Sequence, residues 1–258
     1  MTSLEINGTE TTAGAIHALY RANGSFLLRG FLSSSEIEAL QNIGNMCYAI
    51  GEAIAANAPP EQVPHEISDG LLTRGYISWT RMKSWLACSG TSLDAQLAAI
   101  VDKVGAVART AYADPTVKLL EGFSVIRRHR RLPRAGEMTT VPWHRDYSFV
   151  GPAGIDRSVN FWIPLAEVGE IAPSIDVIVG SHSYMVNVPD DTPGITNIAE
   201  QWVSEHLGGY RRWTPRCTPG DVMVFDHQTI HRTQPLTTQA SIDRMNFEMR
   251  WAPSNAQR

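Results

Sequence analysis

The chain has 258 residues, of which 43% are hydrophobic, and its formal net charge is −4. The hydrophobic share excludes a disordered chain, and the acidic balance gives no electrostatic reason to expect nucleic acid as a partner. The sequence contains no apolar run of about 18 residues and no secretory pattern at its N-terminus. We therefore expect a cytoplasmic protein with no membrane partner.

No internal repeat or long Pro-, Gly- and Ser-rich linker divides the chain, so we expect one domain over residues 1–258. The three cysteines are widely spaced and odd in number. This pattern favours reduced core residues over a disulfide framework or a zinc cluster.

Helical periodicity dominates the first part of the chain. Apolar residues at helical spacing predict helices at 12–22, 35–56 and 92–112. Ser35 and Glu38 predict a capping box at the start of the second helix, and the apolar run 25–32 predicts a strand. The segment 57–90 holds several prolines and glycines, and it predicts irregular structure.

Beyond Pro115, short β-rich runs alternate with turn residues. These runs predict strands at 117–128, 140–149, 158–164, 174–179, 221–226 and 243–252. One further helix is predicted at 197–207. The order predicts an α+β fold, in which a barrel or sandwich of antiparallel strands (about 116–254) is braced by a helical N-terminal part (about 1–115).

His144 and Asp146 stand two residues apart in the predicted strand 140–149. Side chains at i and i+2 share one face of a strand, so both can reach one ion. An imidazole with a carboxylate suits a first-row divalent metal. The pair alone does not define a site, because a surface His–Asp pair or a core histidine would have the same pattern.

His231 offers a third ligand, 85 residues after Asp146 and just behind a predicted buried strand. Two histidines and one carboxylate on facing strands form the facial triad of non-haem Fe(II) oxygenases, with three positions left for cosubstrate and oxygen. His227 lies in the same segment and competes for this role, but we expect it to lie behind the ligands or in the core.

An iron site that uses 2-oxoglutarate must also hold the distal carboxylate of that molecule, and the fork of an arginine matches a carboxylate. Arg244, thirteen residues after His231, is the predicted clamp. On an extended strand it shares a face with Asn246, Glu248 and Arg250. Arg250 is the alternative clamp, although the role expected of it is a surface salt bridge.

The motifs "WHRD", "VNFWIPL", "VIVGSHS", "PGDVMVFDHQTIHRT" and "RMNFEMRW" follow one another in the order of the phytanoyl-CoA dioxygenase family, which this chain resembles. The opening "GSFLLRGFLSSSEIEAL" is similar to that family as well. The resemblance spans about 20–252, except 57–90 and 183–215. It implies a jelly roll, or double-stranded β-helix, and an Fe(II)- and 2-oxoglutarate-dependent oxygenase that consumes O2 and releases succinate and CO2.

The resemblance also implies roles for single residues. Fe(II) would be bound by His144, Asp146 and His231, and 2-oxoglutarate would be held by Arg244 and Thr233 beside Trp162, which lines the pocket. Halogenases related to the family have a small residue at the position of Asp146, which leaves room for chloride. A carboxylate there implies hydroxylation, with desaturation or ring formation as alternatives.

The substrate is predicted to be a small molecule of secondary metabolism, taken up by a monomer or homodimer. The five arginines in 127–134 could provide the counter-charge for an anionic substrate. The alternative is that they are exposed to solvent at the end of a strand and in the following loop. Arg127 and Ser148 are the candidate substrate contacts, Ser148 because it shares the parity of the metal ligands. The segment 57–90, with its aromatic residues, is a candidate lid or substrate wall.

Three other functions stay open at this point. The run "RMNFEMR" is similar to one in AlkB-like nucleic-acid demethylases of the same iron class, but the acidic charge and the long interval between Asp146 and His231 disfavour that function. A non-catalytic jelly roll that binds metal or 2-oxoglutarate is disfavoured by the presence of all three ligands and Arg244. A cupin-like hydrolase or isomerase has no need of Arg244.

Overall fold

The computed structural model describes residues 3–138, 140–184, 188–189, 197–236 and 240–255. Its helices are α1 (Ala13–Asn23), α2 (Ser34–Asn57), α3 (Trp79–Ser89), α4 (Leu93–Tyr112), α5 (Tyr147–Val150) and α6 (Glu200–Leu207). Shorter helical segments are η1 (Pro60–Gln62), the π-helix η2 (Glu66–Thr73), η3 (Glu121–Phe123), η4 (Gly151–Ala153) and η5 (Ser181–Ser183).

The strands are β1 (Glu5–Asn7), β2 (Ser25–Arg29), β3 (Tyr76–Ser78), β4 (Lys118–Leu119), β5 (Val125–His129), β6 (Val159–Pro164), β7 (Ile175–Ile178), β8 (Arg212–Trp213), β9 (Val222–Asp226), β10 (His231–Thr233) and β11 (Arg244–Ala252). They form a larger sheet in the order β1-β2-β9-β6-β11-β5-β3, with β4 on β11, and a smaller sheet in the order β10-β7-β8. Only β1 and β2 pair in parallel among the described strands. This is the predicted α+β jelly roll.

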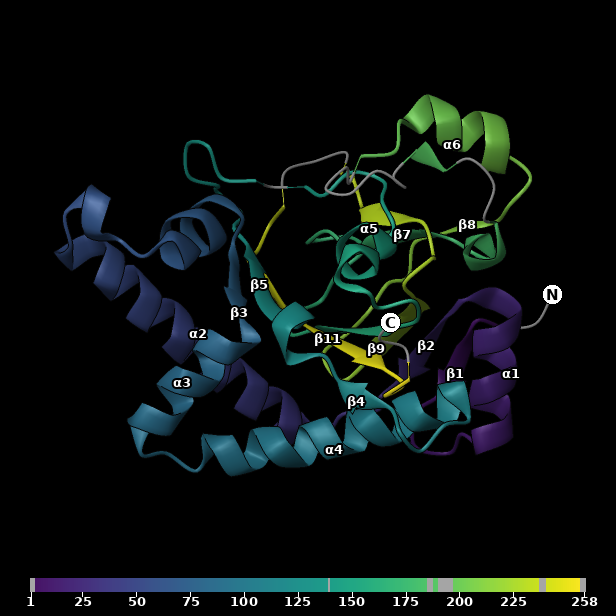
Figure 1. The fold of residues 1–258 in the computed structure, drawn as a ribbon, viewed down its shortest axis with the longest axis horizontal. Coiled ribbons are helices and arrows are strands. Elements are labelled where there is room, and N and C mark those ends of the chain that lie inside the picture. The colour runs from purple at the N-terminus through teal and green to yellow at the C-terminus, as the bar shows by residue number, and fades with distance from the viewer. Residues whose placement is uncertain (1–2, 139, 185–187, 190–196, 237–239, 256–258) are drawn as a thin grey trace.

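The side chains of β9 show how the core is divided into two layers. Val222 and Val224 join the cluster formed with helices α2 and α4, which lie along the outside of the larger sheet (Figure 1). Met223 and Phe225 join the cluster that includes Val177 of the smaller sheet. Because successive side chains alternate across a strand, one strand serves both layers. The candidate functional site lies in the space between the two sheets.

Most of the predicted elements are confirmed with small shifts at their ends. The helices predicted at 12–22, 35–56, 92–112 and 197–207 correspond to α1, α2, α4 and α6, and the strands at 25–32, 158–164, 174–179, 221–226 and 243–252 correspond to β2, β6, β7, β9 and β11. The capping box of α2 is formed by Ser33 and Glu36, so the prediction of Ser35 and Glu38 was wrong. The N–H of Leu32 donates to the carbonyl of Gly220 at 2.9 Å, which anchors the chain at this residue. Ser33, the next residue, is therefore the N-cap, and α2 begins at Ser34.

The segment 57–90 is not irregular, contrary to the prediction. Its prolines all precede η2, and the rest forms β3 and α3. Ser78 caps α3 by accepting from the N–H of Arg81, and Trp79 is buried against the ring of Phe247 in β11. Strand β3 pairs with β5, so this part of the segment belongs to the scaffold rather than to a lid.

The predicted strand at 140–149 is also wrong. Only His144 makes a strand-like bridge, with His231, and the chain then turns into α5. Asp146 has helical backbone angles (φ −61°, ψ −23°), and its carbonyl accepts from the N–H groups of Phe149 and Val150. In the same way, η3 divides the strand predicted at 117–128 into β4 and β5.

The three cysteines are free. Cys47 and Cys217 are buried, and burial raises the pKa of each thiol to about 12, whereas Cys88 is exposed and so departs from the expected core position. Across the described ranges, no helix combines the length and the apolar character that crossing a membrane requires.

Candidate metal and cosubstrate site

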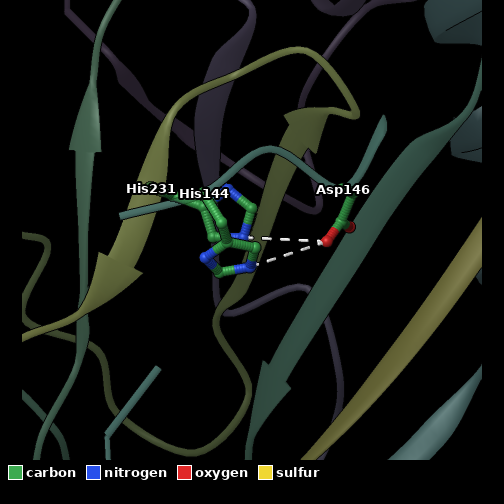
Figure 2. Close-up of side chains that lie close together, drawn as sticks. All are labelled: His144, Asp146 and His231. Atoms are coloured by element: carbon green, nitrogen blue, oxygen red, sulfur yellow. Dashed lines mark ion pairs between the residues drawn. The ribbon is translucent and has the colours of Figure 1, made fainter. Parts of the chain in front are cut away.

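His144, Asp146 and His231 converge between the two sheets, as Figure 2 shows. One ligand atom from each lies within 4.8 Å of the others, and all three residues are buried. The Oδ1 atom of Asp146 lies 3.9 Å from Nε2 of His144 and 3.8 Å from Nε2 of His231. Two imidazole nitrogens and a carboxylate oxygen at these separations suit one divalent first-row metal ion.

Backbone hydrogen bonds hold the two histidines in register. The N–H of each donates to the carbonyl of the other, at 2.9 and 3.0 Å. Nδ1 of His144 lies 2.7 Å from the carbonyl of Pro142, and Nδ1 of His231 lies 2.9 Å from that of Thr229. Because a carbonyl only accepts, each Nδ1 carries the proton and each Nε2 presents its lone pair to a metal.

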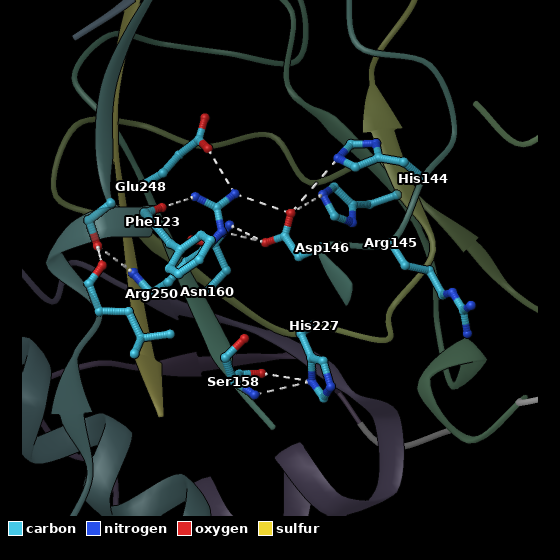
Figure 3. Close-up of polar contacts among 12 residues, drawn as sticks. Phe123, His144, Arg145, Asp146, Ser158, Asn160, His227, Glu248 and Arg250 are labelled. Carbon is cyan, nitrogen blue, oxygen red and sulfur yellow. Dashed lines mark hydrogen bonds and ion pairs between the residues drawn. The ribbon is translucent and has the colours of Figure 1, made fainter. Parts of the chain in front are cut away.

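Asp146 is held by side chains from two neighbouring strands (Figure 3). Arg250 of β11 donates from Nε to Oδ2 at 2.8 Å and from Nη2 to Oδ1 at 3.1 Å. Asn160 of β6 donates to Oδ2 at 3.0 Å. Burial raises the pKa of Asp146, but the charge and hydrogen bonds of Arg250, together with the neighbouring histidines, outweigh it and hold the pKa well below its usual range. Asp146 is therefore ionised, as a metal ligand must be.

Arg250 is buried, so the expectation of a surface salt bridge was wrong. Apart from Asp146, it donates to Glu248 at 3.2 Å and to the carbonyl of Phe123 at 2.6 Å. These contacts occupy the N–H groups of the Arg250 guanidinium with acceptors from the protein itself.

Arg244, Thr233 and Trp162 line the same cavity as the two histidines. Arg244 is 1% exposed; its guanidinium lies 5.4 Å from the Trp162 ring, and Nη1 donates to the carbonyl of Pro173 at 2.9 Å. Its Nε has no partner, and none of the ion pairs of the described residues includes it. Burial lowers the pKa of Arg244 to about 9, because the charge of Glu248, which lines the same cavity, offsets only part of the cost of burying this cation.

Thr233 lines the same cavity as Arg244, on β10 two residues after His231. Its N–H donates to the carbonyl of Val141, and its Oγ1 accepts from the N–H of Val141 at 3.0 Å. The hydroxyl proton of Thr233 is therefore available to an acceptor in the cavity.

Arg127 is the member of the basic run that lines the cavity, where it donates to Glu248 at 3.0 Å. Three other arginines of the run pair with Glu52 instead: Arg128, Arg130 and Arg134. These three arginines share one carboxylate and do not line the cavity, so most of the run lies outside it.

Ser148 does not lie where strand parity placed it. The turn into α5 breaks the alternation, and its hydroxyl donates to the carbonyl of Arg145 at 2.8 Å. Phe149 lines the cavity in its place, with its ring 5.8 Å from that of His144. His227 is buried, and its Nδ1 contacts Ser158 and Asp226, which agrees with its expected place outside the ligand set.

Phe149, Asn160 and Glu248 are cavity residues that the sequence did not single out for this site. Asn160 could have been found, because it precedes Trp162 by two residues on a strand and shares its face. Phe149 could not, because its placement depends on the turn after Asp146.

Lowering the pH from 6.5 to 4.5 is expected to reduce the free energy of unfolding of the metal-free protein by about 2 kcal/mol. Burial, followed by the charge of His231, lowers the pKa of His144 to about 3 from 6.5. Between these values the unfolded chain binds a proton that the native state lacks, so stability falls as the pH falls. Urea unfolding in the presence of a chelator measures this. His144→Gln should flatten the profile, and an unchanged profile in that variant would contradict the assignment.

The jelly roll and the His-Asp-His cluster beside a buried, unpaired arginine define the class of Fe(II)- and 2-oxoglutarate-dependent oxygenases. The family model described as "Phytanoyl-CoA dioxygenase (PhyH)" matches residues 20–245. The chain therefore belongs to the phytanoyl-CoA dioxygenase family and is an oxygenase of this class. No match was found among curated proteins.

Solved structures of low sequence identity share the fold. The epimerase SnoN from nogalamycin biosynthesis is 15% identical, with a TM-score of 0.63 over 94% of this chain and 83% of that chain. EctD from S. alaskensis, solved with 2-oxoglutarate and 5-hydroxyectoine, is 18% identical, with a TM-score of 0.66 over 95% and 77%. EvdO2 from Micromonospora carbonacea var. aurantiaca is 17% identical, with a TM-score of 0.62 over 97% and 94%.

Proposed function

We propose that this protein couples the decarboxylation of 2-oxoglutarate to the oxidation of an unactivated C–H bond in a small molecule. His144, Asp146 and His231 hold Fe(II), while Arg244 and Thr233 hold the distal carboxylate of 2-oxoglutarate. With both groups bound, the iron would supply the chemistry that activates O2 for oxidation of the substrate. Succinate and CO2 are released with the oxidised substrate.

The observation that carries this proposal is the unpaired charge of Arg244. A buried guanidinium without a carboxylate partner is costly, and a ligand carboxylate removes that cost. The hydroxyl of Thr233 offers a further donor in the same cavity, and the ring of Trp162 packs against the cation. This end of the site thus supports binding of a dicarboxylate whose other end reaches the metal.

The protein's own residues prepare the ligands before any metal arrives. Both histidines turn Nδ1 toward a backbone carbonyl, which leaves Nε2 as the nitrogen that can bind a metal, and Asp146 stays ionised beside Arg250. The carboxylate of Asp146 occupies the position that a chloride ion would need, which supports hydroxylation over halogen transfer. The burial of all three ligands limits access of water to the metal.

The substrate is proposed to be a small metabolite, because the structural neighbours SnoN and EctD were solved with nogalamycin RO and 5-hydroxyectoine. Arg127 lines the cavity and supports contact with a polar or anionic group of the substrate, although Glu248 already neutralises part of its charge. The free cysteines support a reducing, cytoplasmic location. We propose that the protein acts as a monomer or homodimer, without another protein as partner.

Release of succinate tests the proposal. The protein is supplied with Fe(II), 2-oxoglutarate and air, together with a panel of small carboxylic acids, amino acids, phosphonates, CoA esters and a methylated oligonucleotide. We expect at least one small molecule to raise succinate release and to gain one oxygen atom. Stimulation by the oligonucleotide alone would identify a demethylase instead. If no succinate forms above a metal-free control, the proposal fails.

A further inference from the structure

The two oxygens of Asp146 are held unequally. Oδ2 accepts from two donors, Nε of Arg250 at 2.8 Å and Nδ2 of Asn160 at 3.0 Å. Among the described residues, Oδ1 accepts from Nη2 of Arg250 alone, at 3.1 Å, and it is the oxygen that faces the Nε2 atoms of both histidines. The carboxylate is thus fixed in rotation, with one oxygen on the metal side and the other turned toward donors.

Arg250 is itself held on every side. Its Nη1 donates to the carbonyl of Phe123 at 2.6 Å, and its Nη2 also donates to Oε2 of Glu248 at 3.2 Å. Glu248 in turn accepts on Oε1 from Arg127 at 3.0 Å and from Asn246 at 3.2 Å. All of these side chains except Arg127 are buried. Figure 3 shows the resulting path from Glu248 through Arg250 to Asp146.

Attraction of the metal does not explain this arrangement. A guanidinium beside a ligand repels a divalent cation and competes with it for the carboxylate. What the planar fork offers is a fixed direction for the carboxylate, because its two N–H bonds match the two oxygens.

We propose that Arg250, held by Glu248, is a positioning residue that presents a single oxygen of Asp146 to the metal. The inference rests on the proposed iron site. Three protein donors instead of four leave three positions of an octahedral ion for the two oxygens of 2-oxoglutarate and for O2. If Asp146 were free to rotate, its second oxygen could take one of those positions.

Binding of Co(II) alone, followed by its ligand-field absorption, tests this role without turnover. In Arg250→Gln and Arg250→Lys we expect metal affinity to fall about 10- to 100-fold, as is usual when a group that orients a ligand is lost. The absorption spectrum should also change, because the donor set changes. Glu248→Gln should have a smaller effect in the same direction, since it loosens Arg250 without removing it. Arg128→Gln, on the same strand as Arg127 but paired with Glu52, should bind Co(II) like the wild type.

The pair of Arg250 variants separates geometry from charge. Lysine keeps the charge and loses the fork, so equal binding by wild type and Arg250→Lys would overturn the proposal. Tighter binding by Arg250→Gln would overturn it too, since charge would then dominate. Thermal unfolding checks that the variants fold, and Arg250→Lys carries the test if Arg250→Gln does not. If the wild type binds no better than His144→Ala, the iron site itself is wrong. If the Arg250 variants bind Co(II) like the wild type while His144→Ala does not, the iron site stands and the positioning role falls.

Discussion

His144→Ala is expected to lower 2-oxoglutarate decarboxylation by at least about 10³-fold, to the level without metal, because the reaction depends wholly on bound iron. The variant keeps one histidine and one carboxylate, which are too few to retain Fe(II) against buffer and chelator. The fold should survive, since His144 is a buried group whose loss leaves no charge unpaired. Succinate release and metal content, measured on the same sample, check the prediction.

Asp146→Ala should be equally inactive but less stable. It removes one of the two carboxylates that neutralise buried Arg250, and breaking a buried ion pair costs about 3–5 kcal/mol. Comparing the two variants therefore separates loss of the metal from loss of the fold. Full activity in either variant would refute the ligand set.

Arg244→Met should raise the 2-oxoglutarate concentration needed for half-maximal rate by about 10²-fold or more, the effect of losing one buried charged contact. The variant should also be at least as stable as the wild type when no cosubstrate is present. Arg244 has no carboxylate partner among the described residues, so the substitution removes a desolvated cation without leaving an unpaired anion. The thermal shift caused by 2-oxoglutarate should disappear.

Arg250→Met provides the contrast. Its removal leaves Asp146 and Glu248 without their shared cation, so the variant should be less stable than the wild type even without cosubstrate. If Arg250→Met, and not Arg244→Met, raises the requirement for 2-oxoglutarate while metal binding is unchanged, then the carboxylate clamp is Arg250.

The sequence alone determined the elements that local periodicity encodes. Apolar spacing was enough for α2 and α4, and the alternation of "RMNFEMRW" correctly put Arg244, Asn246, Glu248 and Arg250 on one face of β11. It also singled out the three metal ligands, because a His and an Asp two residues apart, followed by a distant His, are a pattern of residue types. The helices, the strand and the His144–Asp146 pair are signals between neighbours along the chain, whereas His231 was recognised by its residue type and its place after a predicted strand.

Only the tertiary structure decided which of the two arginines, Arg244 or Arg250, pairs with a carboxylate of the protein. Arg244 and Arg250 look alike in the sequence, six residues apart on one face. Arg250 lies against Asp146, 104 residues away along the chain, whereas Arg244 meets no carboxylate of the described protein. The turn into α5 likewise depends on Tyr147, whose N–H donates to the carbonyl of His227. Ion pairs and hydrogen bonds between distant segments form only once the strands are paired, so no local pattern could have revealed them.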